Sequence, residues 1–340
     1  MGGSVVDITR QLDNGENKLL SICIPTYNRA EYLRKTLDSI VNQEGFVEHC
    51  EIVISDNGSS DNTAEVVEEF VSLYSNIRYH QNETNIGPDR NFLKVMDFAL
   101  GKYIKLHGDK LCFYKTGLTR LIGYLKKTEV STVFLLNCQN NLSEKGMINC
   151  GSFDEFVGKV SYWSTWMGGI ILRNSDYKNL QDKERAIGSF LIQTDIMFRI
   201  VSKNPISQII NELVLFEQPI KVKGGYNFFE VFLDNYLSLY EDYIFAGLLT
   251  QRTYKKEKTK LLRFFVFPWY TQTVLRKRYQ FKLAGANKTI IRHYKTYIQL
   301  YSFPVYLLIQ AIRKTNDLLC RISFISSIEN YIETTFKRRK

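Results

Sequence analysis

Short apolar runs and amphipathic stretches alternate through the first third of the chain, and this alternation restricts the fold more than any other feature. The apolar runs, which have the length of buried strands, occupy residues 19–24, 51–55, 77–80 and 103–106. The stretches with apolar residues at helical spacing occupy residues 31–42, 66–74 and 92–99. Repeated strand–helix units predict an α/β fold, a Rossmann-like and mostly parallel sheet with helices on both faces.

Polar side chains gather just past the ends of these predicted strands. They are the segment Thr26-Tyr27-Asn28-Arg29, the pair Asp56-Asn57, the loop 85–90 and Asp109. In open parallel sheets, ligands bind beyond the carboxyl ends of the strands. The sequence therefore predicts a ligand site built from these four segments.

The rest of the chain is less regular. Strands are expected at 131–137 and 168–174, a buried helix at 190–201, and helices throughout from about residue 231. The expected organisation is a flexible N-terminus (1–18), an α/β domain (19–230) and a basic helical region (231–340).

Several common enzyme classes lack their sequence signatures here. We find no glycine-rich phosphate-binding loop, no GxGxxG after the first strand and no HExxH, and the four histidines do not cluster. The six cysteines show no metal-binding spacing, so buried free thiols and a reducing compartment are expected. The N-terminus does not read as a signal peptide, which favours a cytoplasmic protein.

Four sequence blocks in order resemble the family 2 glycosyltransferases of the GT-A fold. The blocks are residues 21–40, 51–63 and 85–92 and the strand that ends before Asp109, and the resemblance covers roughly residues 19–225. The chain looks most similar to bacterial enzymes that build surface polysaccharide such as capsule or O-antigen, of the abequosyltransferase-like group. The resemblance implies inverting transfer from a nucleotide-sugar to a polyprenyl-diphosphate-linked glycan. A nucleotidyltransferase, which has a similar sheet, is a weaker alternative, because Pro-Thr-Tyr-Asn stands where its glycine-rich loop belongs.

The resemblance assigns a donor pocket to the first three blocks. It implies that Pro25, Thr26, Tyr27 and Asn28 line the base and that Asp56 contacts uracil, which favours a UDP-sugar. It also implies that a loop containing Asn85, Gly87 and Arg90 closes over the nucleoside, with Arg90 as the cationic contact. The alternative for Asp56 and Asn57 is a plain turn. Asp61 is expected to start the next helix.

Asp109 stands where the family has its DxD motif, whose acids hold Mn²⁺ or Mg²⁺ on the donor diphosphate. Here Lys110 and Leu111 replace the usual second acid. Asp109 alone then binds the metal, or Lys110 supplies part of its positive charge, or the site is inactive and the protein only binds a nucleotide or glycan. We expect either a high metal requirement or none.

The acceptor side is assigned to two further segments. Asp195 is the one acid in an apolar helical stretch and is the candidate catalytic base. The alternatives are a helix residue that faces solvent or Arg199, or another acid as the base, namely Asp182, Glu184 or Glu217. Trp163, Trp166 and Gly168 are candidates for acceptor binding, because aromatic faces stack on sugars; the alternative is that both tryptophans belong to the core.

The C-terminal ninety residues are strongly basic, with 20 Lys and Arg against 4 Asp and Glu in residues 251–340. Their apolar runs are shorter than the roughly 20 residues that span a bilayer, and Pro268 and Pro304 interrupt them. Basic and aromatic side chains together favour peripheral binding to the inner face of the cell membrane. The alternatives are ordinary helix packing and a homo-oligomer interface. No base-reading module is recognisable, so nucleic acid is not an expected partner.

Overall fold

The computed structural model describes residues 18–137, 142–219, 224–276 and 279–297. The chain divides into two compact units, one formed by Met1–Ile220 and Tyr240–Glu257 and the other by Lys221–Leu239 and Lys258–Lys340. We call them unit 1 and unit 2. This division differs from the expected boundary after residue 230, because residues 240–257 return to the α/β unit. The expected flexible N-terminus lies outside the described residues, apart from Lys18.

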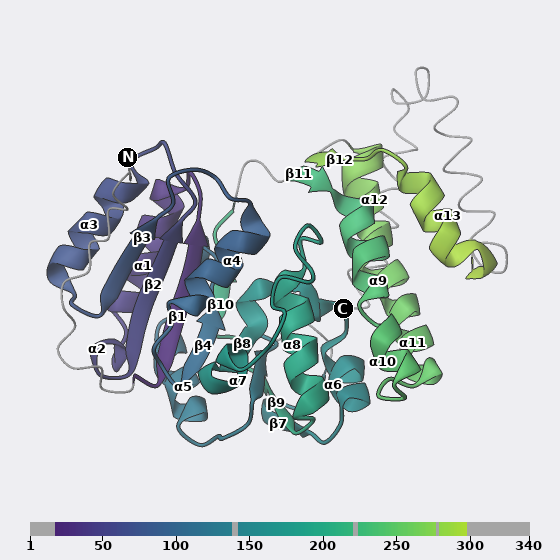
Figure 1. Cartoon of the computed structure of the whole chain (residues 1–340), viewed down its shortest axis with the longest axis horizontal. Coiled ribbons are helices and arrows are strands. Elements are labelled where there is room, and N and C mark those ends of the chain that lie inside the picture. The colour runs from purple at the N-terminus through teal and green to yellow at the C-terminus, as the bar shows by residue number, and fades with distance from the viewer. Residues whose placement is uncertain (1–17, 138–141, 220–223, 277–278, 298–340) are drawn as a thin grey trace. The chain divides into compact units, whose positions relative to one another are not determined.

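Unit 1 is built on one eight-stranded sheet (Figure 1). In spatial order its strands are β3 (Ile77–Gln81), β2 (Cys50–Asp56), β1 (Leu20–Thr26), β4 (Tyr103–Leu106), β8 (Ile170–Arg173), β6 (Thr132–Leu135), β9 (Ser207–Asn211) and β7 (Gly146–Cys150). The first four strands run parallel, as does the pair β6–β9. Strands β8 and β7 run antiparallel to their neighbours. The predicted α/β architecture is confirmed.

Helices cover both faces of this sheet. Those of unit 1 are α1 (Ala30–Val41), α2 (Phe46–His49), α3 (Thr63–Leu73), α4 (Pro88–Asp97), α5 (Gly117–Leu125), α6 (Phe153–Val160), α7 (Asn174–Lys178), α8 (Ile192–Lys203), α10 (Glu241–Phe245) and most of α11 (Gln251–Leu261), with short 3₁₀ turns η1 (Ser161–Thr165) and η2 (Met167–Gly169). The alternate β1 residues Leu20, Ile22 and Ile24 share a core with α1 and α3. On the opposite face, α4 is joined to β2 by hydrogen bonds between Asn91 and Ser55.

A second, smaller sheet joins two segments that the sequence pattern did not identify. Strand β5 (Leu111–Phe113) pairs antiparallel with β10 (Leu215–Glu217). Each has only three residues, which is too short for a period-two pattern to be recognised. This pairing places Glu217 opposite Leu111, directly after the turn that carries Asp109.

Unit 2 is mainly helical, with η3 (Glu230–Asn235), α9 (Tyr236–Ser238), η4 (Leu262–Val266), α12 (Phe267–Tyr270), η5 (Thr271–Leu275) and α13 (Ala286–Tyr297). The expectation of helices throughout is wrong in one place, because β12 (Gln280–Lys282) pairs with β11 (Gly224–Asn227). The core is aromatic. The ring of Phe228 contacts those of Phe232, Phe265, Trp269 and Phe281.

Candidate active site

The carboxylate of Asp109 lies at the carboxyl end of the sheet, against the last residue of β1 and the segment that follows it. One oxygen accepts a hydrogen bond from Thr26 Oγ1 and the other pairs with Arg29 Nη1, both at 3.3 Å. Strands β1 and β4 are parallel neighbours, which is why the residues after them meet. The Asp109 side chain is only 12% exposed. Its burial raises the pKa of the carboxyl group, and the nearby Arg29 opposes that rise.

Asp56 and Asn57 connect the end of β2 to the loop before α4. The fully buried Asp56 accepts hydrogen bonds from the backbone of Ser59 at 2.9 Å and from Tyr79 Oη at 2.7 Å. Asn57 donates to Asn85 Oδ1 at 2.9 Å and accepts from the backbone of Ile86 at 2.9 Å. The loop that we expected to close over a nucleoside is therefore bound directly to the end of β2.

The segment after β1 turns sharply and is hydrogen-bonded to the loop that follows β2. Asn28 has a left-handed backbone (φ 52°), and its side chain accepts a hydrogen bond from the amide of Ser60 at 2.7 Å. Tyr27 is 44% exposed, so its ring is available to a ligand. Pro25 is buried in β1, and Arg90 is exposed in the first turn of α4. Gly87 accepts from Asn57 at 3.4 Å.

Asp61 binds the starts of two helices. Its carboxylate accepts hydrogen bonds from Thr63 at the start of α3 and, at 3.1 Å, from the backbone of Ala30 at the start of α1. The prediction that Asp61 is a helix-start residue is confirmed.

Lys110 points to an acid that comes from the second sheet. Its ammonium lies 2.9 Å from Glu217 Oε2, and the Lys110 side chain is 20% exposed. The carboxylate of Glu217 therefore offsets part of the positive charge that the sequence analysis assigned to Lys110. Arg29 is the cation in direct contact with Asp109, and sequence reasoning did not single it out because its partner is 80 positions away.

A preformed divalent-metal centre does not fit these residues. Within the described ranges there is no group of three or more His, Cys, Asp or Glu side chains placed to hold an ion. Asp109 is a single carboxylate whose two oxygens already contact Thr26 and Arg29. Mg²⁺ and Mn²⁺ favour several oxygen ligands, so this donor set alone would bind either ion weakly.

The predicted acceptor segment lies next to the Asp109 turn. A Cβ atom on Gly168 would lie 2.6 Å from Leu111 Cδ1 and 2.7 Å from Trp166 Cζ2, so only glycine fits between these side chains. The ammonium of the fully buried Lys105 donates to the Gly168 carbonyl at 2.6 Å. Trp163 and Trp166 are half-buried, and Trp166 packs against the hydrophobic core of unit 1.

Asp195 lies in the first turn of α8 and is almost completely buried, at 1% exposure. Arg185 contacts both of its oxygens, with Nη2 at 2.5 Å from Oδ1 and Nε at 3.1 Å from Oδ2. Arg199 adds a second ion pair at 3.6 Å. The alternative that Asp195 faces solvent is wrong, whereas its pairing with Arg199 is observed. Arg185, which sequence reasoning missed, reaches Asp195 from a loop and also pairs with the exposed Asp242 at 3.3 Å.

Hydrogen bonds link α8 to the predicted acceptor segment. Thr194 Oγ1 donates to the carbonyl of Ser164 at 3.1 Å, and Gln193 Nε2 donates to that of Thr165 at 3.4 Å. Asp195 and the tryptophan segment are therefore parts of one connected structure within unit 1.

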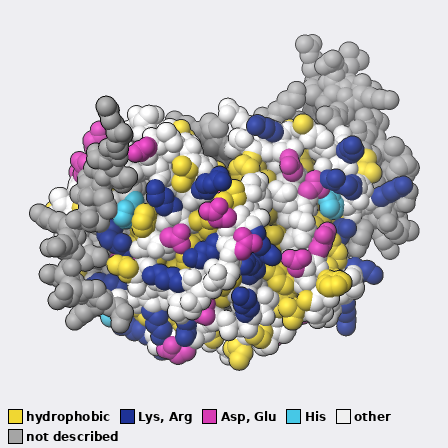
Figure 2. Space-filling view, viewed as in Figure 1, with side chains coloured by type: hydrophobic (Ala, Val, Ile, Leu, Met, Phe, Trp, Pro, Cys, Tyr) yellow, Lys and Arg dark blue, Asp and Glu magenta, His cyan; other side chains and the backbone are white. Residues whose placement is uncertain are grey.

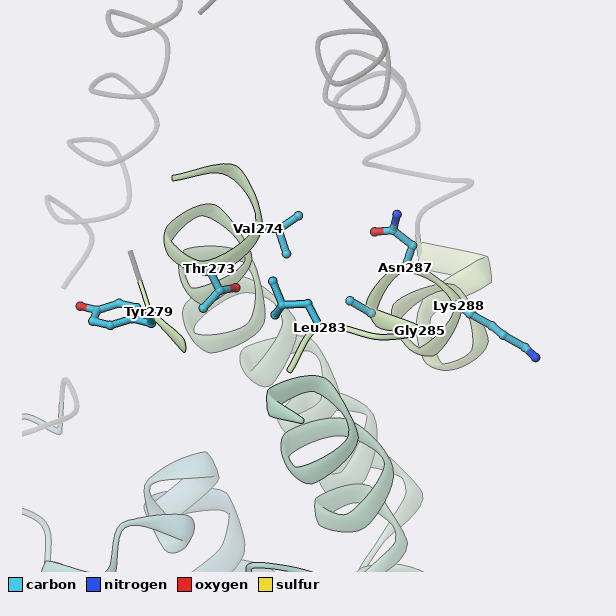
Figure 3. Close-up of a pocket in the computed structure, with 8 residues that line it drawn as sticks. Thr273, Val274, Tyr279, Leu283, Gly285, Asn287 and Lys288 are labelled. Carbon is cyan, nitrogen blue, oxygen red and sulfur yellow. The ribbon is translucent and has the colours of Figure 1, made fainter. Parts of the chain in front are cut away.

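Unit 2 contains a pocket of about 490 Å³ that shares no lining residue with the site around Asp56 and Asp109. Its lining residues are Thr273, Val274, Tyr279, Leu283, Gly285, Ala286, Asn287 and Lys288. Figure 3 shows Val274 and Leu283 turned toward each other and the Lys288 ammonium directed away from them. None of these lining residues is an acid, and we assign no catalytic chemistry to the pocket.

The face of the molecule shown in Figure 2 carries charges of both signs. On the face in Figure 2, Lys and Arg side chains are interspersed with Asp and Glu. No helix within the described ranges combines the length and the apolar character that crossing a membrane requires.

Comparison with known proteins identifies the domain that carries this site. Residues 21–185 match the family model described as glycosyl transferase family 2. This segment, which is just under half of the chain, is a domain of glycosyl transferase family 2. The matched range contains Thr26, Asp56 and Asp109, and it ends ten residues before Asp195.

Among curated relatives, the chain is 46% identical over 108 residues to abequosyltransferase RfbV of Salmonella typhimurium. That match covers 32% of each protein, so about two thirds of the relative's length lies outside it. The S. aureus TarS 1–349 structure in complex with UDP-GlcNAc has a TM-score of 0.60 and 16% identity, over 82% of this chain and 80% of that one. The mannosyltransferase PcManGT of Pyrobaculum calidifontis, in complex with GDP-Man and Mn²⁺, has a TM-score of 0.54 and 13% identity, over 93% and 85%. The two structures establish the shared GT-A fold.

Proposed function

We propose that this protein is an inverting glycosyltransferase that uses a nucleotide-sugar, with a UDP-sugar as the expected donor. One observation carries the proposal: the segments after β1, β2 and β4 and the loop before α4 are joined by direct hydrogen bonds. The joined segments are those that the family resemblance assigns to the donor. The UDP-GlcNAc bound to a structure of the same fold is consistent with this choice of ligand.

The donor pocket would use side chains that the structure leaves accessible. Tyr27 would lie along the base, and the exposed Arg90 would meet the nucleotide as the cationic contact. Asp56 is fully buried, so its contact with a uracil would require the base to reach the end of β2. Asn85 and Gly87 would hold the loop in place through Asn57.

The positive charge at the donor diphosphate would come at least partly from the protein. Arg29 is 36% exposed and pairs with Asp109, so it can contact both the carboxylate and an incoming phosphate. Asp109 is the side chain that would contact Mn²⁺ or Mg²⁺, and such an ion would supply further charge stabilisation at the diphosphate. Because Asp109 is one carboxylate with partners on both oxygens, we expect a requirement for a high metal concentration or none.

Asp195 is our candidate for the base that accepts the proton of the acceptor hydroxyl. Its oxygens contact Arg185 and Arg199, so an acceptor hydroxyl would have to share or replace one of these contacts. Arg185 is 34% exposed and comes from a loop, which makes it the partner that can move. The partners of Asp195 thus orient the carboxylate before the acceptor arrives.

The proposed acceptor is a polyprenyl-diphosphate-linked glycan of bacterial surface-polysaccharide synthesis, reached from the inner face of the cell membrane. The basic excess of residues 251–340 supports binding to an anionic surface. Residues 298–340, which hold the segment around Pro304, lie outside the described residues. Partitioning onto anionic vesicles that weakens with salt, and is lost when residues 251–340 are deleted, is the expected result; no binding by the full chain would refute the membrane role.

A donor panel tests the reaction most directly. Release of nucleoside diphosphate from UDP-, GDP-, CDP- and dTDP-sugars is measured with EDTA and over a range of Mn²⁺ concentrations. We expect release from a UDP-sugar. Nucleotide binding without release would instead support the alternative of a catalytically inactive binding protein, for which the single acid at Asp109 is the specific observation.

Two isosteric variants test the base. Asp195→Asn should lower turnover at least 100-fold, since a general base contributes about 10²–10⁴ in rate. Asp242→Asn is the matched control, because Asp242 also binds Arg185 but is exposed. Near-normal turnover by Asp195→Asn would remove the assignment.

A further inference from the structure

Asp89 connects the loop that contains Asn85 and Gly87 to the segment that leads into α8. It lies in the first turn of α4, two positions after Gly87, and is 5% exposed. Its Oδ2 atom accepts hydrogen bonds from the backbone amides of Gly188 at 2.7 Å and Phe190 at 3.1 Å. These contacts cross about 100 positions of sequence and reach the residues directly before α8.

The segment that Asp89 holds has a strained backbone. Gly188 has φ of 89° and Phe190 has φ of 60°, and the second value is unfavourable for a residue with a bulky side chain. A bulky residue in this conformation is strained and keeps it only where surrounding contacts enforce it. The paired amides on one carboxylate are such contacts, and Ser189 adds a hydrogen bond to the carbonyl of Ala186 at 2.6 Å.

Burying the Asp89 carboxylate has a cost in desolvation free energy. Burial raises the pKa of its carboxyl group, although the amides of Phe190 and Gly188 act in the opposite direction. Its Oδ1 atom is buried and has no hydrogen-bond partner among the described residues. A neutral amide at this position would avoid the desolvation of the charge, so the acid is held here at a cost in desolvation.

The contacts of Asp89 join two parts of the proposed reaction site. On one side, Asn85 and Gly87 are bound to Asn57 at the end of β2. On the other side, α8 begins at Ile192 and carries Asp195 in its first turn. A shift of the segment around Phe190 would therefore move the start of the helix that holds the candidate base.

We propose that Asp89 is a positioning residue that couples the nucleotide-binding loop to Asp195 by fixing the backbone of residues 188–190. This inference rests on the proposed function. Binding of a nucleotide to the loop would stabilise Asp89, and Asp89 would in turn stabilise the start of α8. The residue would affect turnover without contacting the nucleotide.

Hydrogen–deuterium exchange on the full chain separates this inference from the proposed function. Exchange is measured with UDP, GDP, CDP and dTDP, each added separately, in the unmodified protein and in Asp89→Asn and Asp89→Ala. With the nucleotide that protects residues 85–90, we expect slower exchange at residues 186–195 as well. In both variants the protection of 85–90 should remain and that of 186–195 should be lost.

The outcomes distinguish the two proposals. Protection of 85–90 without protection of 186–195 in the unmodified protein would overturn the coupling and leave the donor site standing. No protection anywhere by any nucleotide would overturn the donor site and the coupling with it. Protection of both segments that survives in Asp89→Ala would also overturn the role of Asp89.

Kinetics and stability provide a second readout that a merely structural role would not give. Asp89→Asn should lower kcat for nucleoside diphosphate release about tenfold or more, with the donor KM within about twofold and an unchanged or higher Tm. Glu83→Gln is the matched control, because Glu83 is an exposed acid of the same loop region. A parallel loss of Tm and kcat in Asp89→Asn would reduce Asp89 to a structural anchor and overturn the proposal.

Discussion

Replacing Lys105 with methionine should stabilise unit 1 at pH 7, although the lysine makes good hydrogen bonds. Lys105 lies in β4, has no exposed surface, and donates to the carbonyls of Gly168 at 2.6 Å and Leu106 at 3.3 Å. Burial in this apolar position lowers the pKa of its ammonium group from 10.5 to about 7. Methionine has a similar length and carries no charge to desolvate.

The pKa shift gives the magnitude and its dependence on pH. Between the folded pKa of about 7 and the unfolded value of 10.5, the unfolded chain binds a proton that the folded chain does not. Stability contributed by this position therefore falls as the pH falls through that window, and is constant below it. Linkage places the destabilisation at about 4 kcal/mol at pH 7 and about 2 kcal/mol at pH 9.

The substitution also removes both hydrogen bonds of Lys105, of which the bond to the Gly168 carbonyl is the shorter. Leaving the Gly168 oxygen unsatisfied costs about 1–3 kcal/mol, independently of pH. The net expectation is a gain of about 1–3 kcal/mol at pH 7, which shrinks by about 2 kcal/mol at pH 9. The pH-dependent difference is the sharper quantity, because the loss of the hydrogen bond cancels from it.

Urea unfolding followed by tryptophan fluorescence at pH 7, 8 and 9 measures this difference. All proteins carry Trp269→Phe, so that the remaining tryptophans, Trp163 and Trp166, report on unit 1. Lys102→Met is the matched control, because the Lys102 side chain is 35% exposed and its partner Glu129 is 75% exposed. A stability difference between Lys105→Met and the parent that does not change from pH 7 to pH 9 would refute the reasoning.

Three further results are expected. Gly169→Ala should destabilise unit 1 by about 1–3 kcal/mol in urea unfolding, since its Cβ would lie 2.9 Å from the Leu135 carbonyl; Gly123→Ala, in open space on α5, should not. Because burial raises the pKa of Asp109, Asp109→Asn should melt higher relative to the parent at pH 7 than at pH 4, while nucleotide release falls. An equal difference at both pH values would contradict this. Lys110→Asp should create Mn²⁺-dependent release that Lys110→Ala lacks, and equal release by the two variants at every Mn²⁺ concentration would contradict this.

The strand–helix order of unit 1 was predictable because each element carries its own periodic pattern. The buried runs of β1 to β4 and the apolar faces of α1, α3 and α4 lie where the sequence placed them. The strand-end polar clusters were predictable for the same reason, since parallel neighbours end at one edge of a sheet. Strands β5 and β10 were missed because three residues hold no period, and β12 because it follows a helical stretch.

The pairing of Asp195 with Arg199 was predictable from its spacing of four positions on a helix. The other partners of the candidate residues were not, because their contacts join segments without a shared pattern. Arg29 reaches Asp109 across 80 positions, and Lys110 reaches Glu217 across 107. Arg185 reaches Asp195 across only ten positions, yet from a loop with no periodic signal. In each case the sequence identified one charged residue of the pair, but it did not identify the ion pair itself.

These balancing residues change how the site is expected to work. A lone carboxylate at Asp109 and an isolated acid at Asp195 would both have to be desolvated without compensation, which is costly. Each instead lies against an arginine that is about one third exposed, at 36% for Arg29 and 34% for Arg185. An anionic substrate can approach such a guanidinium from its solvent side while the carboxylate stays in place behind it. The two arginines are therefore the side chains through which a donor diphosphate and an acceptor would first meet the buried acids.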